Sequence, residues 1–484
     1  MVNDRSGPDF GLVAPILDCA ALPFAYSAIP MTVTESHART FWFPLALTIA
    51  TLLFFARSFS SYFVCDDFQF LDRINFNNAG EYLTKSWGYN NEYRPFLPYT
   101  YALDASIGGS SPYGYHITNT LLHVGCALFV AALAGLAGLR RSTAMLASVI
   151  FILNPAAHES VLWISGRPVV LSTFLVLASC YFFQTALRRP GRALWHWIAA
   201  YALFILALCT YELAVVTPLL AGFLAWVGRN DRQRYQKHLA GLLVLSGIYG
   251  LFWMWFFEFR LTRFPVEYSL WRIVTNLADA LSHSFHGSRS LEMAVFYVLL
   301  LGSLWRDPRG RRLSLLAMVW FVIAYLPFFP IQGYADRFIY LSSGATAIVL
   351  AAAILEGVPK KGLKFAAAAV LLGFFGTGMQ NRVTAWREAG VIARAIPLEI
   401  KTSLPDLPSS GELVLLNVPK MHKRSYVFLT SLDRAIEREY PGKKIHVATA
   451  IDASTHDRSI IFEYSDGHMV RRSLAEVRKP TPSR

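Results

Sequence analysis

The sequence predicts a mainly α-helical protein that crosses a membrane many times. Hydrophobic residues make up 54% of the 484 residues, charged residues only 16%, and the mean hydropathy is +0.38. Soluble domains usually carry about 25% charged residues, so this composition excludes an ordinary soluble protein. The net charge of +13 falls in short clusters between apolar runs. We therefore expect no nucleic-acid partner, because no basic stripe follows a polar surface.

Long stretches without Asp, Glu, Lys or Arg mark the membrane spans. A bilayer core needs roughly 20 apolar residues per helix. The stretch from 193 to 228 is broken only by Glu212 and is too long for one crossing, so we expect two helices with Glu212 at their turn. The sequence thus predicts eleven spans, near residues 41–59, 114–139, 142–157, 168–187, 193–211, 213–228, 239–257, 291–305, 313–335, 338–355 and 365–381.

Alternate connections carry the basic clusters, which predicts the orientation. The clusters are "RR" at 140–141, "RRPGR" at 188–192, "RNDRQRYQK" at 229–237, "RDPRGRR" at 306–312 and "KKGLK" at 360–364. Cytoplasmic loops are enriched in Lys and Arg, so all five are expected on the cytoplasmic side. The N-terminus is then cytoplasmic, and the C-terminus lies outside. In a bacterium the membrane would be the plasma (inner) membrane.

The composition also suggests a division into three parts. Residues 1–40 form a cytoplasmic segment without the blocks of a cleaved signal, and translation starting at Met31 is one hypothesis. Residues 41–381 form the transmembrane domain, whose first extracytoplasmic loop, 60–113, is expected to contain one or two interfacial helices. Residues 382–484 have ordinary charge density and predict a small extracytoplasmic α/β domain, with strands at "ELVLLNV" and "RSIIFEY", a turn at "SDG" and a helix over "SYVFLTSLDRAIEREY".

Two adjacent carboxylates, Asp66 and Asp67, follow the first predicted span directly. Such a pair can simply be a solvated polar helix cap. It can also supply a general base at the bilayer surface, with Asp67 slightly favoured over Asp66. A divalent cation bound by the two carboxylates stays open, because hard cations prefer oxygen ligands and a bare Asp-Asp step is weak evidence for such a site.

Other polar residues are expected on the same outer side of the membrane. Arg94, Arg167 and Arg337 could bind a phosphate group through their bidentate guanidinium groups. Arg167 alone could instead contact lipid headgroups. His116, His158, Glu159 and Glu212 are further candidates, although each histidine is as easily a packed interfacial residue and Glu212 a water-facing charge.

Three motifs in order resemble a known enzyme family. These are "EYRPFLPYTYALDASIGGSSPYGYHITNTLLH", "NPAAHESVLWISGRPVVLSTFL" and "YADRFIYLSSGA". Over roughly residues 41–356 they resemble the membrane half of the transmembrane and tetratricopeptide-repeat O-mannosyltransferases, within the GT-C superfamily of polyprenyl-phosphate-sugar glycosyltransferases. The resemblance implies an acidic residue at the position of Asp66 and Asp67. It also implies a cavity for lipid phosphate and sugar, lined by Arg94, His116, Asn119, His158, Glu159, Arg167, Arg337 and Tyr340.

The chain also departs from that family. The last hundred or so residues contain no tetratricopeptide repeat, and Asn154 stands in "NPAAHE" where the family commonly has His. The resemblance therefore implies the class of donor more firmly than the acceptor, which is left open among a glycan, a lipid and a protein.

The expected function is sugar transfer from a polyprenyl-phosphate carrier to an acceptor hydroxyl outside the cytoplasm, with inversion and with an aspartate as base. The expected partners are the lipid-linked sugar, the bilayer and the acceptor. A transporter or flippase of lipid-linked sugars is the alternative, because intramembrane polar residues also mark translocation routes. Transporters usually show repeated halves, and no internal repeat is visible in this sequence. A catalytically inactive scaffold is a third reading.

Overall fold

The computed structural model describes residues 33–71, 73–86, 92–189, 193–228, 232–256, 266–285, 291–407, 413–451 and 459–477. The chain divides into two compact units, residues 1–46 and 47–484. The first contains the beginning of helix α2 (Val33–Phe55). All features below belong to the second unit.

Helices dominate this unit, as the composition predicts. The longer helices are α3 (Leu97–Gly108), α4 (Pro112–Leu136), α5 (Arg141–Leu153), α7 (Arg167–Arg188), α8 (Ala193–Leu208), α9 (Thr217–Val227), α10 (Arg232–Phe256), α11 (Leu270–Ser284), α12 (Leu291–Trp305), α13 (Pro308–Tyr325), α14 (Ser343–Ala352) and α15 (Lys361–Ser403). Short helical turns connect them: η2 (Ala56–Ser58), η3 (Cys65–Gln69), η4 (Ala79–Leu83), η5 (Pro155–Ala157), α6 (His158–Val161), η6 (Ile164–Gly166), η8 (Glu212–Val216), η9 (Leu326–Phe328), η10 (Asp336–Ile339) and η11 (Ala353–Gly357).

Each of the eleven predicted spans coincides with an apolar helix in the described residues. Five helices are long and apolar enough to cross a bilayer, and the bent pair of 141–153 and 155–161 makes a sixth candidate. Shorter apolar helices occupy the other predicted spans: Trp42–Ser58, Ala193–Leu208, Glu212–Val227, Glu292–Trp305 and Ser343–Gly357. The chain is therefore an integral membrane protein, while the number of spans and their orientation stay predictions.

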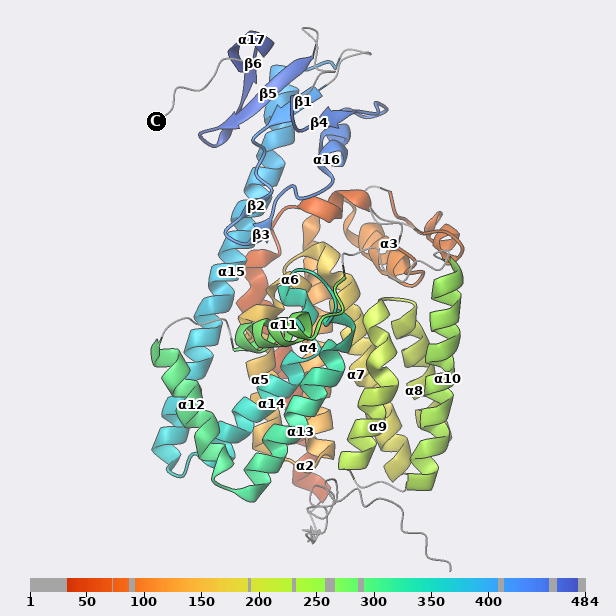
Figure 1. Ribbon diagram of the computed structural model, residues 1–484, viewed down its shortest axis with the longest axis vertical. Helices are drawn as coiled ribbons and strands as arrows, with labels where there is room; N and C mark the ends of the chain where they lie inside the picture. The colour runs from red at the N-terminus through yellow and green to blue at the C-terminus, as the bar shows by residue number, and fades with distance from the viewer. Residues whose placement is uncertain are drawn as a thin grey trace, which may run out of the picture. The chain divides into compact units, whose positions relative to one another are not determined.

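Helix α7 lies at the centre of the bundle. It packs against α4, α8 and α9, and most of its residues are buried. In Figure 1, α8, α9 and α10 form one flank, and α12 and α13 lie on the other side. The amphipathic helix α11 runs across the bundle helices, and α3 lies across their upper end in this view. The connections that carry the predicted site meet at this end.

Helix α15 is longer than the sequence predicts. We expected its span to end near residue 381, but it continues without interruption through 43 residues to Ser403. At 1.5 Å per residue it is about 65 Å long, roughly twice the thickness of a bilayer core. Its second half therefore forms a support for the C-terminal strands, which Figure 1 shows along and above it.

The C-terminal region contains a small mixed sheet, as predicted. Its four strands lie in the order β4 (Val447–Ala448), β1 (Leu413–Leu416), β5 (Ile460–Ser465) and β6 (His468–Arg472). β1 pairs in parallel with β4 and β5, whereas β5 and β6 form a hairpin. Asp466 and Gly467 turn that hairpin with positive φ angles of 52° and 92°, which the "SDG" signal anticipates.

The helix predicted over 425–440 needs correction. Its first half instead forms β3 (Ser425–Tyr426), which pairs with β2 (Met421–His422) in a separate two-stranded hairpin. Helix α16 begins only at Leu432 and ends at Glu439. Aromatic and β-branched residues favour extended structure, and Tyr426, Val427 and Phe428 are buried against neighbouring elements.

Candidate active site

The acidic pair lies in η3, directly after the first apolar helix, and its two carboxylates point to different partners. Cys65 adopts φ = 50°, a left-handed conformation that is uncommon for a residue with a side chain. Asp67 is buried and Asp66 is half-buried. The turn therefore separates one interior carboxylate from one that solvent can reach.

Asp67 anchors the first loop to the turn before α7. It accepts hydrogen bonds from the Val64 N–H at 3.0 Å and from the Ser165 N–H and hydroxyl at 2.8 and 2.5 Å. Burial raises the pKa of Asp67 to about 7, although these hydrogen bonds oppose the rise. All of these hydrogen bonds join Asp67 to protein groups that hold the loop and the turn together.

Asp66 faces the C-terminal region instead. Its carboxylate accepts hydrogen bonds from the Gln69 amide at 2.9 Å and from the Thr430 hydroxyl. Thr430 is 364 residues away in the chain, and no local sequence pattern points to it. The half-buried Asp66 is therefore the member of the pair that a substrate could approach.

Arg94 forms the centre of the first ionic cluster. Its guanidinium contacts Glu92 at 2.8 Å and Glu212 at 3.1 Å, and it lies 4.7 Å from the centre of the Tyr211 ring. Burial alone would lower the pKa of Arg94, but the two carboxylates raise it, so the guanidinium stays charged. Glu212 at the turn between α8 and α9 is therefore not an isolated charge, because it forms an ion pair with Arg94 of the first loop.

Arg337 forms the second ionic cluster with Glu159 and Tyr426. Its Nη1 donates to Glu159 at 3.1 Å and to the Tyr426 hydroxyl at 3.0 Å, and that hydroxyl donates to the other oxygen of Glu159. Burial would lower the pKa of Arg337, but Glu159 raises it. Gly166 makes this arrangement possible, because a Cβ at that position would lie 2.1 Å from the Glu159 carbonyl oxygen.

The two ionic clusters and Asp66 lie within electrostatic reach of one another. The charges of Arg94, Glu212, Arg337 and Glu92 all act on the phenol of the half-buried Tyr211. Burial raises the pKa of Glu92, and the charges of Asp66 and Arg337 act on that carboxyl. The charges of Asp66, Arg94 and Arg337, which come from different segments of the chain, therefore act on one carboxyl, that of Glu92.

A chain of aromatic and acidic groups lies beside the second cluster. The Trp386 indole N–H donates to Nδ1 of His158 at 2.9 Å, so Nε2 of His158 carries the proton that it shares with Asp336 at 2.8 Å. His283 contacts the other Asp336 oxygen, also at 2.8 Å. Burial would raise the pKa of Asp336, but the two histidines hold it well below its usual range.

Arg167 is placed differently from our prediction. Its side chain is completely buried and donates to Asn119, to the Thr100 carbonyl and to the Tyr115 carbonyl, and it pairs with Asp104 at 2.5 Å. A lipid phosphate could not reach this guanidinium without displacing those partners. We therefore correct its expected role from phosphate binding to holding the loop and helix ends together.

Three predicted cavity residues share this interior position. His116 contacts the Ser61 carbonyl at 3.0 Å, and Asn119 donates to the Trp163 carbonyl at 3.2 Å. The Tyr340 hydroxyl lies 2.6 Å from His123. All three side chains are at most 2% exposed, so they pack inside the bundle and line no open surface.

Sequence reasoning missed Tyr426, Thr430, Trp386 and His283. Each contributes a hydrogen bond to a predicted residue or to Asp336, and each comes from a segment outside the three motifs. Within the part of the chain that the structure describes, no group of three or more His, Cys, Asp or Glu is arranged to hold a metal ion. Asp66 and Asp67 also bind separate partners, which does not favour a shared cation.

Comparisons with known proteins give sequence matches over about a third of the chain or less and a fold match over most of it. No family model matches the chain. The protein O-mannosyl-transferase TMTC2 of Mus musculus is 34% identical over 121 residues, which is 24% of this chain and 14% of that protein. TMTC4 of Mus musculus is 25% identical over 185 residues, 33% of this chain and 25% of that protein. The chain thus matches only a minor part of these relatives.

The structural matches cover most of the chain. ArnT from Cupriavidus metallidurans in the apo state has a TM-score of 0.54 at 14% identity, over 86% of this chain and 87% of ArnT. ArnT bound to undecaprenyl phosphate gives 0.51 at 12% identity over the same shares. The chain therefore has the GT-C fold, and the expected resemblance to the TMTC proteins is confirmed.

Proposed function

We propose that this protein transfers a sugar from a polyprenyl-phosphate carrier to an acceptor hydroxyl, with Asp66 as the general base and Arg337 as the main ligand of the leaving phosphate. The observation that carries the proposal is that one segment contacts both groups: Thr430 binds the half-buried Asp66, and Tyr426, four residues earlier, binds Arg337. The charges of Asp66, Arg94 and Arg337 also all act on Glu92. The fold shared with ArnT in complex with undecaprenyl phosphate supports the donor class.

Asp66 suits the role of base better than Asp67. A base must reach the acceptor hydroxyl within hydrogen-bonding distance. Both carboxylate oxygens of Asp67 accept hydrogen bonds from Val64 and Ser165. The partners of Asp66 all contact Oδ1, so its Oδ2 has no hydrogen bond from a residue that the structure describes. Asp67 then serves as the anchor that fixes the direction of Asp66.

Arg337 has donors left for a phosphate. A guanidinium carries five N–H groups. In its side-chain hydrogen bonds to described residues Arg337 uses Nη1 alone, and the side chain is 24% exposed. Arg94 instead uses all three of its nitrogens on Glu92 and Glu212. We therefore assign the direct phosphate contact to Arg337 and a longer-range electrostatic role to Arg94.

The proposed step is a direct displacement. The acceptor oxygen forms a bond to the anomeric carbon as its proton passes to Asp66, and the bond from that carbon to the phosphate oxygen breaks. Negative charge collects on the departing lipid phosphate, where a preorganised guanidinium lowers the barrier by several kcal/mol. Glu159 and Tyr426 hold that guanidinium in place beforehand. A single displacement inverts the configuration of the sugar.

The test uses purified full-length protein, radiolabelled polyprenyl-phosphate-linked sugar and an envelope fraction as the source of acceptor. Asp66→Asn should lower the rate of label transfer by about 10²–10⁴-fold, the usual contribution of a positioned base. Asp406→Asn, at an exposed carboxylate outside the site, is the matched control and should keep full activity. Full turnover by Asp66→Asn would remove it as the base.

The same assay separates transfer from transport. A flippase moves the lipid-linked sugar but leaves the sugar–phosphate bond intact, so thin-layer chromatography would recover all label in the lipid. Release of free polyprenyl phosphate with label in a new product supports the transferase. The observation that favours transfer is that the paired charges gather at one end of the helices, because transporter sites usually lie near the midplane.

A further inference from the structure

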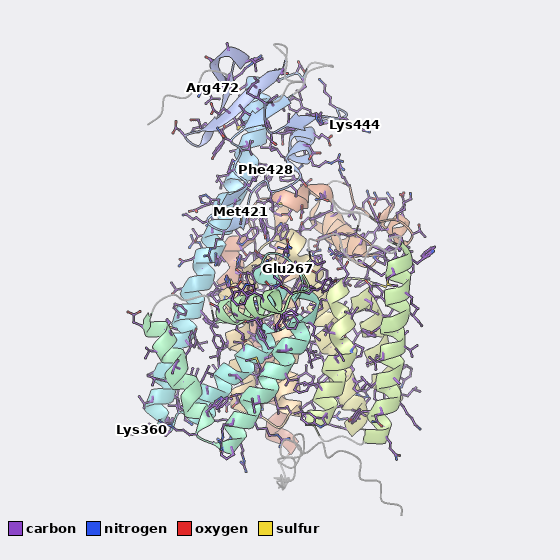
Figure 2. All side chains as sticks on the ribbon, viewed as in Figure 1. Glu267, Lys360, Met421, Phe428, Lys444 and Arg472 are labelled. Atoms are coloured by element: carbon purple, nitrogen blue, oxygen red, sulfur yellow. The ribbon has the colours of Figure 1, made fainter. Side chains whose placement is uncertain are left out.

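Two hollows lie end to end on α15 beside the β2–β3 hairpin. The first, of about 250 Å³, is lined by Gly378, Asn381, Arg382, Ala385 and Lys423. The second, of about 300 Å³, is lined by Glu388, Val391, Ile392, His422 and Lys423. Lys423 borders both, so together they form one groove. Figure 2 labels Met421, the first residue of the hairpin, beside α15.

The spacing of residues on α15 explains why the first hollow exists. Positions 378, 381, 382 and 385 follow the i, i+3, i+4, i+7 pattern and therefore share one face of the helix. Gly378 and Ala385, at the two ends of this set, have almost no side chain. The space that they leave surrounds the longer side chains of Asn381 and Arg382.

Arg382 lines this hollow and has no ion-pair partner among the described residues. The side chain is half-buried, and it makes no hydrogen bond or ion pair with any residue that the structure describes. Acids within electrostatic reach are already engaged: Asp336 binds two histidines, and Glu159 binds Arg337. A half-buried guanidinium without a counter-ion is costly, which favours an anionic ligand.

The hairpin brings two more cations to the same place. Lys423 and Arg424 form its tip with φ angles of 46° and 67°. Turns of this kind normally use Asn and Gly, because other residues are strained at positive φ. Arg424 lies within electrostatic reach of Arg382. Lys423 contacts Glu388 at 2.9 Å, but a pair that is 62% and 40% exposed contributes little and can rearrange.

The position of the groove along α15 indicates the source of the anion. Arg382 lies 21 residues after Lys361, the first residue of α15, and a helix rises about 32 Å over that distance. The hydrocarbon core of a bilayer is about 30 Å thick. Figure 2 shows Lys360 at the far end of α15 from Met421. With the lysines near 361 at one membrane surface, Arg382 lies at the level of the opposite headgroups.

We propose that the groove between α15 and the β2–β3 hairpin binds the phosphate group of an anionic membrane lipid, with Arg382 and Lys423 as its ligands. Arg424 adds positive charge, and Asn381 offers an amide donor. The acyl chains then lie along the apolar part of α15 below Arg382. None of the residues that line the groove has a role in the sugar transfer proposed above, so the lipid site does not depend on that function.

The test is a lipid titration of the full-length protein in detergent, followed by native mass spectrometry. The probes are phosphatidylglycerol, phosphatidylcholine and inorganic phosphate. Arg382→Gln and Lys423→Gln should each weaken phosphatidylglycerol binding about fivefold, as expected for a cation near an anionic headgroup. In the double variant the two losses of affinity should multiply. Arg387→Gln, on α15 but outside the groove, is the matched control and should bind like the wild type.

Each contrary result overturns a defined part of the proposal. Lys423 is mostly exposed, so Lys423→Gln should fold even if Arg382→Gln does not. Unchanged phosphatidylglycerol affinity in Lys423→Gln, or an equal loss in Arg387→Gln, would refute the groove as the site. Equal affinity for phosphatidylcholine would refute selection of an anion. Displacement of the lipid by inorganic phosphate at similar concentration would refute the lipid as the source.

Discussion

Arg167 and Arg337 look alike in sequence, yet the structure uses them in opposite ways. Each lies at a junction between a short turn and a helix, in a motif that resembles the same family. Arg167 begins α7 directly after η6, and Arg337 is the second residue of η10. Arg167 is completely buried and gives its donors to four interior partners, whereas Arg337 is 24% exposed and keeps donors free of side-chain partners among the described residues. An arginine whose N–H groups are all hydrogen-bonded to protein atoms stabilises the fold. An arginine with N–H groups that are not so used can bind a substrate phosphate.

The largest expected effect is a loss of stability when the buried Arg167 is replaced. Arg167→Gln would leave Asp104 as an uncompensated buried charge, so the free energy of unfolding should fall by about 3–5 kcal/mol. Thermal unfolding in detergent measures this change. Arg73→Gln removes an exposed pair with Glu437 and should cost no more than about 1 kcal/mol. Equal losses in the two variants would contradict a structural role for Arg167.

The second prediction tests the proposed catalytic role of the partly exposed Arg337. Arg337→Gln should lower kcat for sugar transfer by about 10²–10³-fold, because a preorganised donor to developing charge is lost. Steady-state kinetics with the lipid-linked sugar measures it, and thermal unfolding should change much less than in Arg167→Gln. Arg272→Gln, which removes a single pair with Glu267, serves as the control. If Arg337→Gln raised KM alone, the residue would bind substrate without stabilising the transition state.

A smaller effect is expected at His283. His283→Ala removes a hydrogen bond to the ionised Asp336 and should cost about 1–2 kcal/mol of stability. The loss should centre on the docking of α11, so hydrogen exchange of 270–284 should increase. His468→Ala, at an exposed pair with Glu399, is the control. Unchanged exchange in α11 would show that His283 does not hold this helix.

A further expected effect is a change in how the free energy of unfolding depends on pH. Burial raises the pKa of Asp67 to about 7 in the folded protein, above its usual 3.8. The stability that its proton contributes is therefore complete below about pH 4 and is lost as the pH rises through 7. Asp67→Asn should remove this component of the pH dependence. Melting temperatures of both proteins between pH 4 and 8 check it, and parallel curves would contradict the burial of an acidic proton.

Sequence patterns predicted the helices well, because long apolar runs without charged residues favour helices in a membrane protein. That Asp66, Arg94 and Arg337 act on one substrate stays a prediction. The patterns did not separate Arg337 from Arg167, since burial depends on what other segments place around each guanidinium. The contact between Tyr426 and Glu159 joins residues 267 positions apart, and no local periodicity encodes such a pairing.

The length of α15 has a mechanical consequence. One unbroken rod carries Arg382, then Trp386, and further along it meets the strand β6. Pro397 lacks the N–H that would bond one turn back, so this position bends most easily, and the stretch before it behaves as a stiff lever. Glu399, which follows this proline, holds β6 through His468 and Met469, so a force on the outer strands would bend the helix at Pro397 before it separated Trp386 from His158.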